Sequence, residues 1–311
     1  MNHPQEWHDE RRKGIGGSDI SILVGTNPYR SKISLWLDKT GKTEPQEGND
    51  KMELGKLMED LIRQEFERRS GYTVEKPTEP FVDGICRGNI DGLISDATGK
   101  PFAVWEGKTT AGYNPDYKDG IPPYVYSQCQ WYLGLVNQIY PEVDTCYIST
   151  IVYQMRCIEY KENTIKFNPK VFAHMKQTAE AFWNDYVLTN ISPEPDGTED
   201  CSKLIADKYP NSNGEEIMLD ESFEELAEQR AFLKKEAKVI EGKISEIENK
   251  IKAEMKENEK ALAGKYEILW KTQKNSSLDT KTLKEQNPQI YKKYLREGTN
   301  RVFKINEKGD Q

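Results

Sequence analysis

The sequence predicts an α/β fold, in which helices flank a mixed β-sheet, followed by a long helix and a small basic α+β module. Strand-like and helix-like patterns alternate from the start of the chain to about residue 190, as in proteins whose sheet is covered by helices. Beyond residue 219, apolar residues recur at steps of three and four, which is typical of a long amphipathic helix. A chain of 311 residues is long enough for one substantial core and an appendage.

The predicted units follow from these changes of pattern. Residues 189–200 concentrate turn-forming residues and have no apolar period, so we place a boundary there. We expect a compact domain over residues 1–190, a linker or crossing loop over 191–218, a coiled-coil-like helix over 219–259 and a basic module over 260–311. In the basic module we expect a strand, a short helix and a closing strand, at residues 265–271, 279–286 and 301–305.

The expected long helix carries an apolar stripe that only Arg230 interrupts. At about 1.5 Å per residue the helix is roughly 60 Å long. The stripe suits a helix that pairs with another helix and equally one that folds back on its own domain, and both alternatives stay open. Its members are Phe223, Leu226, Leu233, Ala237, Ile240, Ile244, Ile247, Ile251 and Met255.

Composition excludes several classes of protein. No stretch approaches the roughly 18 apolar residues that cross a bilayer, and the polar start of the chain lacks the apolar segment of a signal peptide, so we expect a soluble, cytoplasmic protein. The five cysteines contain no C-x-x-C pair, which argues against a disulfide framework and against a zinc or iron–sulfur site. We expect reduced, mostly buried thiols.

The charge distribution is uneven. A net charge of −8 disfavours a nucleic-acid partner, because phosphate binding draws on Lys and Arg. However, residues 261–311 contain eleven Lys or Arg against six acidic residues, a net charge of +5 that leaves −13 on the remainder. A local basic surface is therefore compatible with the acidic average.

The strongest chemical signal lies in two neighbouring segments. In residues 102–108 the two-residue period of a strand places Val104, Glu106 and Lys108 on one face and Trp105 on the other. Asp91 lies in a strand-like segment just upstream, and the turn-rich residues between the two segments predict a hairpin that lays Asp91 beside Glu106. Such a pair of carboxylates can chelate a hard divalent cation.

A cation between two carboxylates suits phosphodiester hydrolysis, because it neutralises the transition state and supplies a deprotonated water. Lys108 would orient or activate that water. The motif alone is weak, since an acidic residue two positions before a lysine is commonly a surface ion pair.

Two helices are expected to add side chains to this site. Glu59 shares a helical face with Met52, Ile62 and Phe66 in residues 51–66, so it should point inward. Gln128 interrupts the Tyr124, Tyr132 and Leu135 stripe of a helix over residues 122–136 that begins at prolines. Gln128 could hold the attacking water or a phosphate oxygen, or be a core amide that backbone groups satisfy.

The N-terminal segment resembles an anion site. Gly14, Gly16 and Gly17 precede Ser18 and Asp19, both good N-cap residues for a helix that runs to Val24. Free amides at a helix start, with Arg11 or Arg12 beside them, could accept a terminal phosphate, and the alternative is a plain capped loop.

Taken in order, these segments resemble the YqaJ-type viral recombinases, relatives of lambda exonuclease in the P-D-(D/E)-x-K nuclease superfamily. The likeness covers roughly residues 1–190, and Ile90 stands where the motif usually has proline. The segments that carry it are Trp7 to Arg11, Ile15 to Asp19, Gly55 to Glu59, Asn89 to Gly92, Glu106 to Lys108 and Gln128 to Tyr132.

The resemblance implies a restriction-endonuclease-like core that degrades linear duplex DNA from the end, in the 5′ to 3′ direction, with Mg²⁺ or Mn²⁺. The products are 3′ single-stranded overhangs for phage-type recombination, and the partner is a single-strand annealing protein. It also implies a ring-shaped trimer and a phage or prophage protein in the cytoplasm of a bacterial host.

The resemblance also implies residue roles. Asp91 and Glu106 would be metal ligands together with the Gly107 carbonyl group, and Lys108 would activate water. The remaining roles are assistance to the water or a second metal ion for Glu59 and Gln128, reception of the 5′ phosphate for Arg11 with Ser18, and substrate binding for Tyr132.

Two other functions compete with the exonuclease. One is a structure-specific or restriction-like endonuclease on the same core, and the other is a non-catalytic DNA-end-binding scaffold whose long helix is an interaction surface. The long helix and the basic module extend beyond the minimal nuclease. The cations of the basic module alternate with Tyr266, Trp270, Tyr291, Tyr294 and Phe303, which suits DNA binding. The alternative, that these aromatic residues form the core of the module, stays open.

Overall fold

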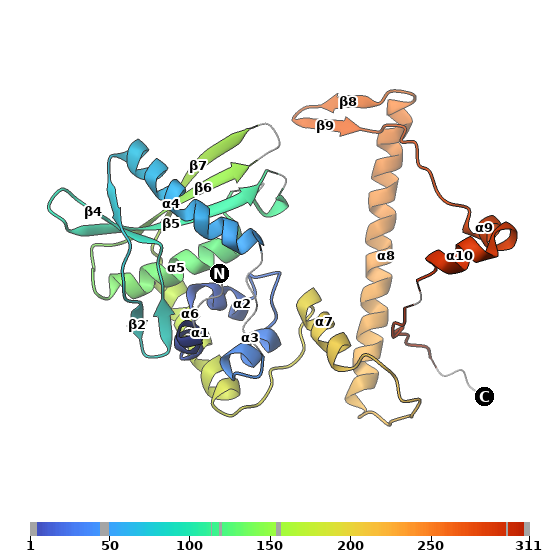
Figure 1. The fold of residues 1–311 in the computed structure, drawn as a ribbon, viewed down its shortest axis with the longest axis horizontal. Coiled ribbons are helices and arrows are strands. Elements are labelled where there is room, and N and C mark those ends of the chain that lie inside the picture. Colours follow the sequence, from blue (N-terminus) through green and yellow to red (C-terminus); the bar gives the residue numbers. More distant parts are fainter. Residues whose placement is uncertain are drawn as a thin grey trace. The chain divides into compact units, whose positions relative to one another are not determined.

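The computed structural model describes residues 5–43, 50–112, 114–117, 120–153, 157–296 and 298–307. The chain divides into two compact units, Met1–Lys208 and Tyr209–Gln311, which are described separately (Figure 1).

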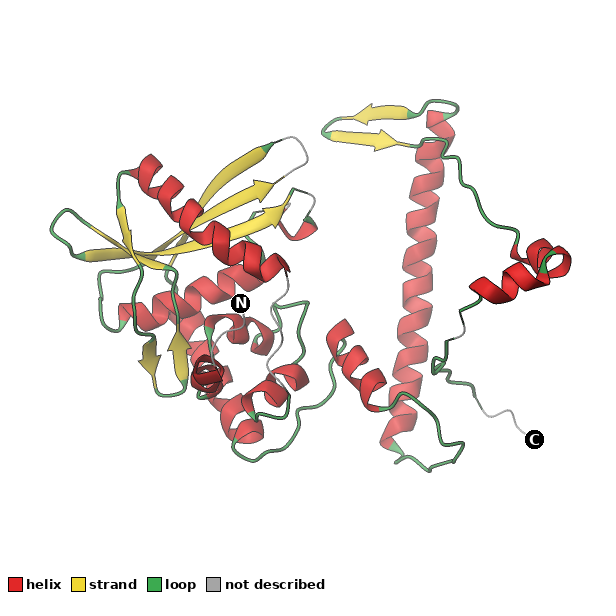
Figure 2. Cartoon of the chain, viewed as in Figure 1, coloured by secondary structure: helices red, strands yellow, loops and turns green. Residues whose placement is uncertain are grey.

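The first unit is built on a five-stranded mixed sheet with the strand order β1-β4-β5-β6-β7. The pairs β1·β4, β4·β5 and β6·β7 are antiparallel, whereas β5 and β6 are parallel and are joined through a helix. The predicted mixed sheet flanked by helices is therefore confirmed (Figure 2). The strands are β1 (Thr73–Glu75), β4 (Gly92–Ser95), β5 (Pro101–Ala111), β6 (Thr145–Tyr153) and β7 (Ile158–Lys166).

Strand β5 separates the two layers of the core through its alternating side chains. Trp105 faces α4 (Asp50–Ser70), where it packs against Phe66 at a ring-centroid distance of 6.2 Å and shares a buried cluster with Ile62. Val104 faces the other way, into the larger cluster under α5 (Pro123–Asn137). The predicted separation of Trp105 from Val104 is confirmed, and the sheet is covered on both faces.

The layer under α5 is extended by further helices and by a small hairpin. Helices α2 and α6 pack against α5, and α6 starts at the cap residue Asn168, which accepts hydrogen bonds from the N–H groups of Lys170 and Val171. The remaining elements of this unit are α1 (Gln5–Arg12), α2 (Gly17–Leu23), α3 (Lys32–Lys39), β2 (Phe81–Asp83), β3 (Cys86–Gly88), η1 (Pro115–Tyr117), α6 (Pro169–Phe182), η2 (Trp183–Val187) and α7 (Glu199–Lys208).

The stretch 191–218, expected to be a linker or crossing loop, contains helix α7. Thr198 begins this helix by accepting a hydrogen bond from the N–H group of Cys201, and Asp200 accepts hydrogen bonds from the Ser31 and Ser34 hydroxyl groups at the start of α3. These contacts fasten α7 to the first unit, so the division falls after Lys208.

The second unit contains α8 (Ser222–Met255), the hairpin of β8 (Lys260–Ala263) and β9 (Tyr266–Leu269), α9 (Thr280–Gln286) and α10 (Pro288–Tyr294). The strand expected at 265–271 and the helix expected at 279–286 are present. The prediction of a closing strand at 301–305 is wrong, because those residues have no regular secondary structure. Phe303 instead lies against the Arg230 guanidinium group. Pro288 begins a helix rather than only ending one, as proline can at a first helical position.

The cysteines are free, as expected, and all are buried except Cys157. Among the described helices, none combines the length and the apolar character needed to span a bilayer.

Candidate active site

The β4–β5 hairpin brings the two predicted carboxylates together. Gly92, the first residue of β4, pairs with Trp105 of β5, so Asp91, one residue before β4, lies opposite Glu106. The Gly107 N–H group donates a hydrogen bond to Asp91 Oδ2 at 3.0 Å. The predicted hairpin is confirmed, and the backbone of β5 fixes the position of the Asp91 carboxylate.

Two further side chains converge on Glu106. The Lys108 ammonium group lies 2.6 Å from Glu106 Oε1, and the Gln128 amide group donates to the same oxygen at 2.9 Å. Gln128 also accepts from Lys108 at 3.2 Å and donates to the Tyr132 hydroxyl oxygen at 3.0 Å. The bonds of Gln128 therefore go to polar side chains, and the alternative of a core amide satisfied by backbone groups is wrong.

Burial strongly perturbs the electrostatics of this cluster. Burial, together with the nearby charge of Asp91, raises the pKa of Glu106 to about 8, although Lys108 opposes the shift. Burial works against protonated Lys108, but the negative charges of Glu106 and Asp91 outweigh it and hold the pKa of Lys108 above its ordinary value. Burial likewise raises the pKa of Asp91. Such shifts are typical of functional sites.

The donor set fits a hard divalent cation. Glu106 Oε2 is buried and has no hydrogen-bond partner among the described residues. A buried carboxylate oxygen without a partner is costly unless it meets a cation or holds a proton. Asp91, Glu106 and the Gly107 carbonyl group supply the oxygen ligands that Mg²⁺ and Mn²⁺ prefer.

Glu59 is not gathered with these two carboxylates. Within the described part of the chain, no three acidic, histidine or cysteine side chains are close enough to share a metal ion. Glu59 forms an ion pair with Lys76 and is 25% exposed, yet its negative charge contributes to the raised pKa of Asp91. Glu59 therefore lies beside the pair. Of the residues predicted to share its face, Ile62 is buried, and the Met52 side chain lies outside the described residues.

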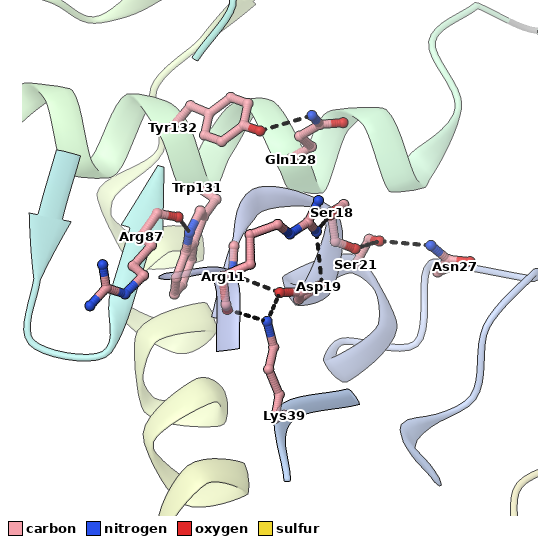
Figure 3. Close-up of polar contacts among 11 residues, drawn as sticks. Arg11, Ser18, Asp19, Ser21, Asn27, Lys39, Arg87, Gln128, Trp131 and Tyr132 are labelled. Atoms are coloured by element: carbon pink, nitrogen blue, oxygen red, sulfur yellow. Dashed lines mark hydrogen bonds and ion pairs between the residues drawn. The ribbon is translucent and has the colours of Figure 1, made fainter. Parts of the chain in front are cut away.

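Arg11 and Ser18 lie together at the start of α2, where Arg11 donates a hydrogen bond to the Ser18 hydroxyl oxygen at 3.2 Å (Figure 3). Arg12 instead donates to the carbonyl groups of Asp38 and Thr43, at 3.1 and 3.0 Å. Of the two arginines considered from the sequence, Arg11 is therefore the one that faces Ser18.

The prediction that Ser18 or Asp19 is the N-cap of α2 is wrong. The N-cap is Gly16, and Asp19, at the third helical position, accepts a hydrogen bond from the Gly16 N–H group at 2.9 Å. Asp19 is fully buried and meets the buried Lys39 ammonium group at 2.7 Å, as Figure 3 shows. Burial opposes its charge, but Lys39 and Arg11 more than compensate and lower the pKa of Asp19 to about 2.

Lys39 also donates a hydrogen bond to the Arg11 carbonyl oxygen at 2.9 Å. The buried Asp19–Lys39 pair therefore ties three elements together, namely the end of α1, the start of α2 and the end of α3. It holds the Arg11 backbone in place while the Arg11 guanidinium group stays 35% exposed beside Ser18.

One cleft of about 760 Å³ is lined by residues from both parts of the site. Arg11, Ser18 and Asp19 line it together with Asp91 and Gln128. Tyr132 also lines the cleft but is only 6% exposed. Its ring packs so closely on α2 that a Cβ atom at Gly17 would lie 2.4 Å from it, so Tyr132 joins the two parts.

Some residues of the site were not predicted from the sequence. Lys76, Arg87 and Asn89 line the cleft, and Lys39 supports it from below. Lys76 follows a three-residue strand in a loop that carries no local signal. Lys39 has one signal in the sequence, because it lies on the same helical face as the buried Leu35 and Trp36, where a lysine needs a buried acidic partner.

A family model described as a YqaJ-like viral recombinase domain matches residues 6–137. The uncharacterized protein YqaJ of Bacillus subtilis (strain 168) is 34% identical over 310 residues, which are 97% of this chain and 94% of that protein. The chain belongs to the YqaJ-like viral recombinase family. The resemblance found in the sequence motifs is thereby confirmed.

The solved structures that match this chain have a lower sequence identity to it than YqaJ of Bacillus subtilis has. An alkaline exonuclease from Laribacter hongkongensis is 17% identical, with 66% of this chain and all of that chain covered and a TM-score of 0.45. LHK-Exo in complex with dAMP is 15% identical, with 66% of this chain and 97% of that chain covered and a TM-score of 0.48. A phage-related exonuclease from Haemophilus somnus 129PT is 12% identical, with 60% of this chain and all of that chain covered and a TM-score of 0.42. Likenesses this distant assign no role to any residue.

Proposed function

We propose that this protein is a metal-dependent exonuclease that degrades linear duplex DNA from its 5′ ends and leaves 3′ single-stranded overhangs. The observation that carries this proposal is that Asp91 and Gln128 line the same cleft as Arg11 and Ser18. Glu106 and Lys108 lie directly behind Gln128, which is hydrogen-bonded to both, and Arg11 donates a hydrogen bond to the Ser18 hydroxyl oxygen. The first group suits phosphodiester hydrolysis, and the second suits a terminal phosphate.

Asp91, Glu106 and the Gly107 carbonyl group would hold Mg²⁺ or Mn²⁺. When bound, the ion would neutralise phosphoryl charge and lower the pKa of a water molecule. A second ion would require a further ligand, and Glu59 could supply it by leaving Lys76. The two-metal form of the reaction thus depends on a side chain that has another partner in the present structure.

Lys108 and Gln128 would act on the attacking water and the phosphate. Because its pKa is raised, Lys108 keeps its proton and acts as a charged hydrogen-bond donor rather than as a base. Gln128 contacts both Lys108 and Glu106, so it keeps their side chains in one orientation and can turn its amide group towards the water.

Arg11 and Ser18 would receive the 5′ phosphate of the DNA end. The negative charge of Asp19 already satisfies the Gly16 N–H group at the start of α2, so the partly exposed Arg11 guanidinium group supplies the charge for the phosphate. Fixing the 5′ phosphate in this way gives the 5′ to 3′ polarity. The resulting 3′ overhang is the substrate for a single-strand annealing protein, and a ring-shaped trimer stays a prediction that the mass in solution tests.

The test is the digestion of an end-labelled linear duplex with and without a 5′ phosphate, in Mg²⁺ and in chelator. We expect metal-dependent release of nucleotides from phosphorylated 5′ ends and a loss of at least a hundredfold in rate for Lys108→Ala, consistent with the loss of an electrostatic contact to the transition state. Lys100→Ala is the matched control, because the Lys100 ammonium group pairs with Glu142 on the surface.

Two results would contradict the proposal. Cleavage of covalently closed circular duplex at the rate of linear duplex would favour the endonuclease. DNA-end binding without digestion in either metal, with Lys108→Ala equal to the wild type, would favour the non-catalytic scaffold.

A further inference from the structure

Helix α8 carries an apolar stripe that its own unit leaves mostly uncovered between Phe223 and Ile247, whereas Met255 at its end is buried and Phe303 lies over Arg230. Figure 1 shows α8 as one uninterrupted helix from Ser222 to Met255, which at 1.5 Å per residue is about 50 Å long. Large apolar side chains on it are between 48% and 64% exposed, namely Phe223, Leu226, Leu233, Ile240, Ile244 and Ile247. An exposed apolar surface of this extent marks an interaction site.

The stripe follows a repeat of seven residues over the whole helix, with its members at the first (a) and fourth (d) positions. Alternating steps of three and four are typical of a helix that pairs with another helix, whereas a helix that covers a globular domain has a wider apolar face. Phe232 and Val239 are the exposed large apolar residues of α8 that lie outside this repeat. The a positions are Phe223, Arg230, Ala237, Ile244 and Ile251, and the d positions are Leu226, Leu233, Ile240, Ile247 and Glu254.

Four charged side chains flank the central part of the stripe. Glu236 and Lys243 occupy g positions, and Lys234 and Glu241 occupy e positions, where the charges of a coiled coil select partner and orientation. None of the four has an ion-pair partner among the residues that the structure describes. The four charges are therefore available to pair with charges on another helix that covers the stripe.

We propose that α8 pairs with α8 of a second copy of this chain, in antiparallel orientation and with full overlap. In that arrangement g positions face g positions and e positions face e positions. Glu236 then lies opposite Lys243 of the second copy, and Lys234 lies opposite Glu241. Because the two copies are equivalent, each of these oppositely charged pairs occurs twice, and no like-charged pair forms among the four residues.

The parallel orientation fits less well. There, a g position faces the e position five residues further along the second copy, so Glu236 would face Glu241. The a positions would also face each other, which places two Arg230 side chains together in the stripe. In the antiparallel pair Arg230 faces Ile247, along which its aliphatic part can pack while its charged end reaches solvent.

The test is sedimentation of the full chain over a range of concentrations. The wild type should self-associate. Glu236→Lys should weaken the association roughly tenfold, because it replaces two attractive pairs by two repulsive ones, and Lys243→Glu should do the same. Combining Glu236→Lys with Lys243→Glu restores opposite charges across the pair and should restore the association.

Glu228→Lys and Lys235→Glu are matched controls, because they make the same charge changes at f positions, on the outer side of α8. They should leave the association constant unchanged. A wild-type chain that stays monomeric would overturn the proposal, and so would variants that associate like the wild type. Tighter association of Glu236→Lys would show a parallel pair and equally overturn it. Because the readout is a response to charge on α8, association through the first unit does not mimic it, and digestion of DNA is not needed.

Discussion

Glu106 has the most perturbed environment of the proposed metal ligands, because its carboxylate is buried and one of its oxygens has no partner among the described residues. With a pKa of about 8 it holds a proton at neutral pH in the metal-free protein. A metal ion must displace that proton. We therefore predict that Mn²⁺ or Mg²⁺ affinity rises up to about tenfold per pH unit and levels off above about pH 8.

Calorimetric titration at several pH values measures this dependence. The same pKa shift also makes the stability of the metal-free protein depend on pH. Because the pKa of Glu106 in the folded protein exceeds the ordinary value of 4.5, the free energy of unfolding falls as the pH rises towards about 8. Glu106→Gln should remove the larger part of both dependences and leave the part that comes from Asp91, whose pKa burial also raises. A wild-type affinity that does not change between about pH 6 and pH 8 would contradict the assignment.

Lys39 is the residue that makes the buried charge of Asp19 tolerable. Lys39→Met leaves Asp19 with only the more distant Arg11, so we predict a loss of about 3–5 kcal/mol in the free energy of unfolding. Because the pKa of Asp19 is lowered to about 2, its stabilising contribution is present above 3.8 and is lost as the pH falls towards 2. In Lys39→Met this loss should begin at higher pH.

Urea denaturation measures these changes, with Lys13→Met as the control, because Lys13 forms an exposed ion pair with Glu10. The control should stay near the wild-type stability. Adding Asp19→Asn to Lys39→Met should recover part of the loss, since it removes the unpaired charge. If Lys39→Met alone behaves like Lys13→Met, the ion pair does not support this part of the fold.

At the scale of elements, the contact between α2 and α5 joins the phosphate side of the cleft to the metal side. Gly17→Ala would place a Cβ atom 2.4 Å from the Tyr132 ring. We predict a loss of about 1–3 kcal/mol in stability and a larger relative loss in nuclease rate, because a displaced Tyr132 releases Gln128.

Gly16→Ala is the matched control, since its added Cβ atom would meet Asp19 only at 3.4 Å and its cost is limited to the poorer fit of alanine at the N-cap position. Denaturation and digestion rates for both variants measure the difference. Equal effects of the two substitutions would show that the close packing of Tyr132 on Gly17 determines neither the stability nor the digestion rate.

The elements that could be predicted from the sequence are those with a strong local period. The alternation around Glu106 predicted β5, and the turn-rich segment before it predicted the hairpin that positions Asp91. The cap of α2 was misplaced because Asp19 is both a good N-cap residue and a good third residue, and local sequence does not distinguish the two. The Asp19–Lys39 pair and the turn of Glu59 towards Lys76 depend on contacts between distant segments, which no local pattern records.

At the scale of the whole molecule, the basic C-terminal residues should add affinity for DNA. Removing residues 271–311 leaves α8 and the β8–β9 hairpin complete and removes ten Lys or Arg residues against five acidic ones, a net charge of +5. We predict weaker DNA binding and a shallower dependence of log affinity on log salt concentration, by about one unit for each DNA phosphate that the tail no longer neutralises.

Fluorescence anisotropy of a labelled duplex at several salt concentrations measures this slope. The digestion rate at saturating DNA should change little, because the cleft lies within the first unit. An unchanged affinity and an unchanged slope would refute a role of the tail in DNA binding. That role was inferred from charge and aromatic content alone. In the structure Tyr294 and Phe303 are largely exposed, and Phe303 contacts the Arg230 guanidinium group of α8.

The central claim is that Asp91 and Glu106 together hold a divalent cation. The most direct measurement is an anomalous difference map from a crystal of this protein grown with Mn²⁺. We predict a peak within ligand distance of an Asp91 carboxylate oxygen and of Glu106 Oε2, and its disappearance in Asp91→Asn. A fully occupied Mn²⁺ site elsewhere, or an empty position between these two carboxylates at saturating Mn²⁺, would contradict the account.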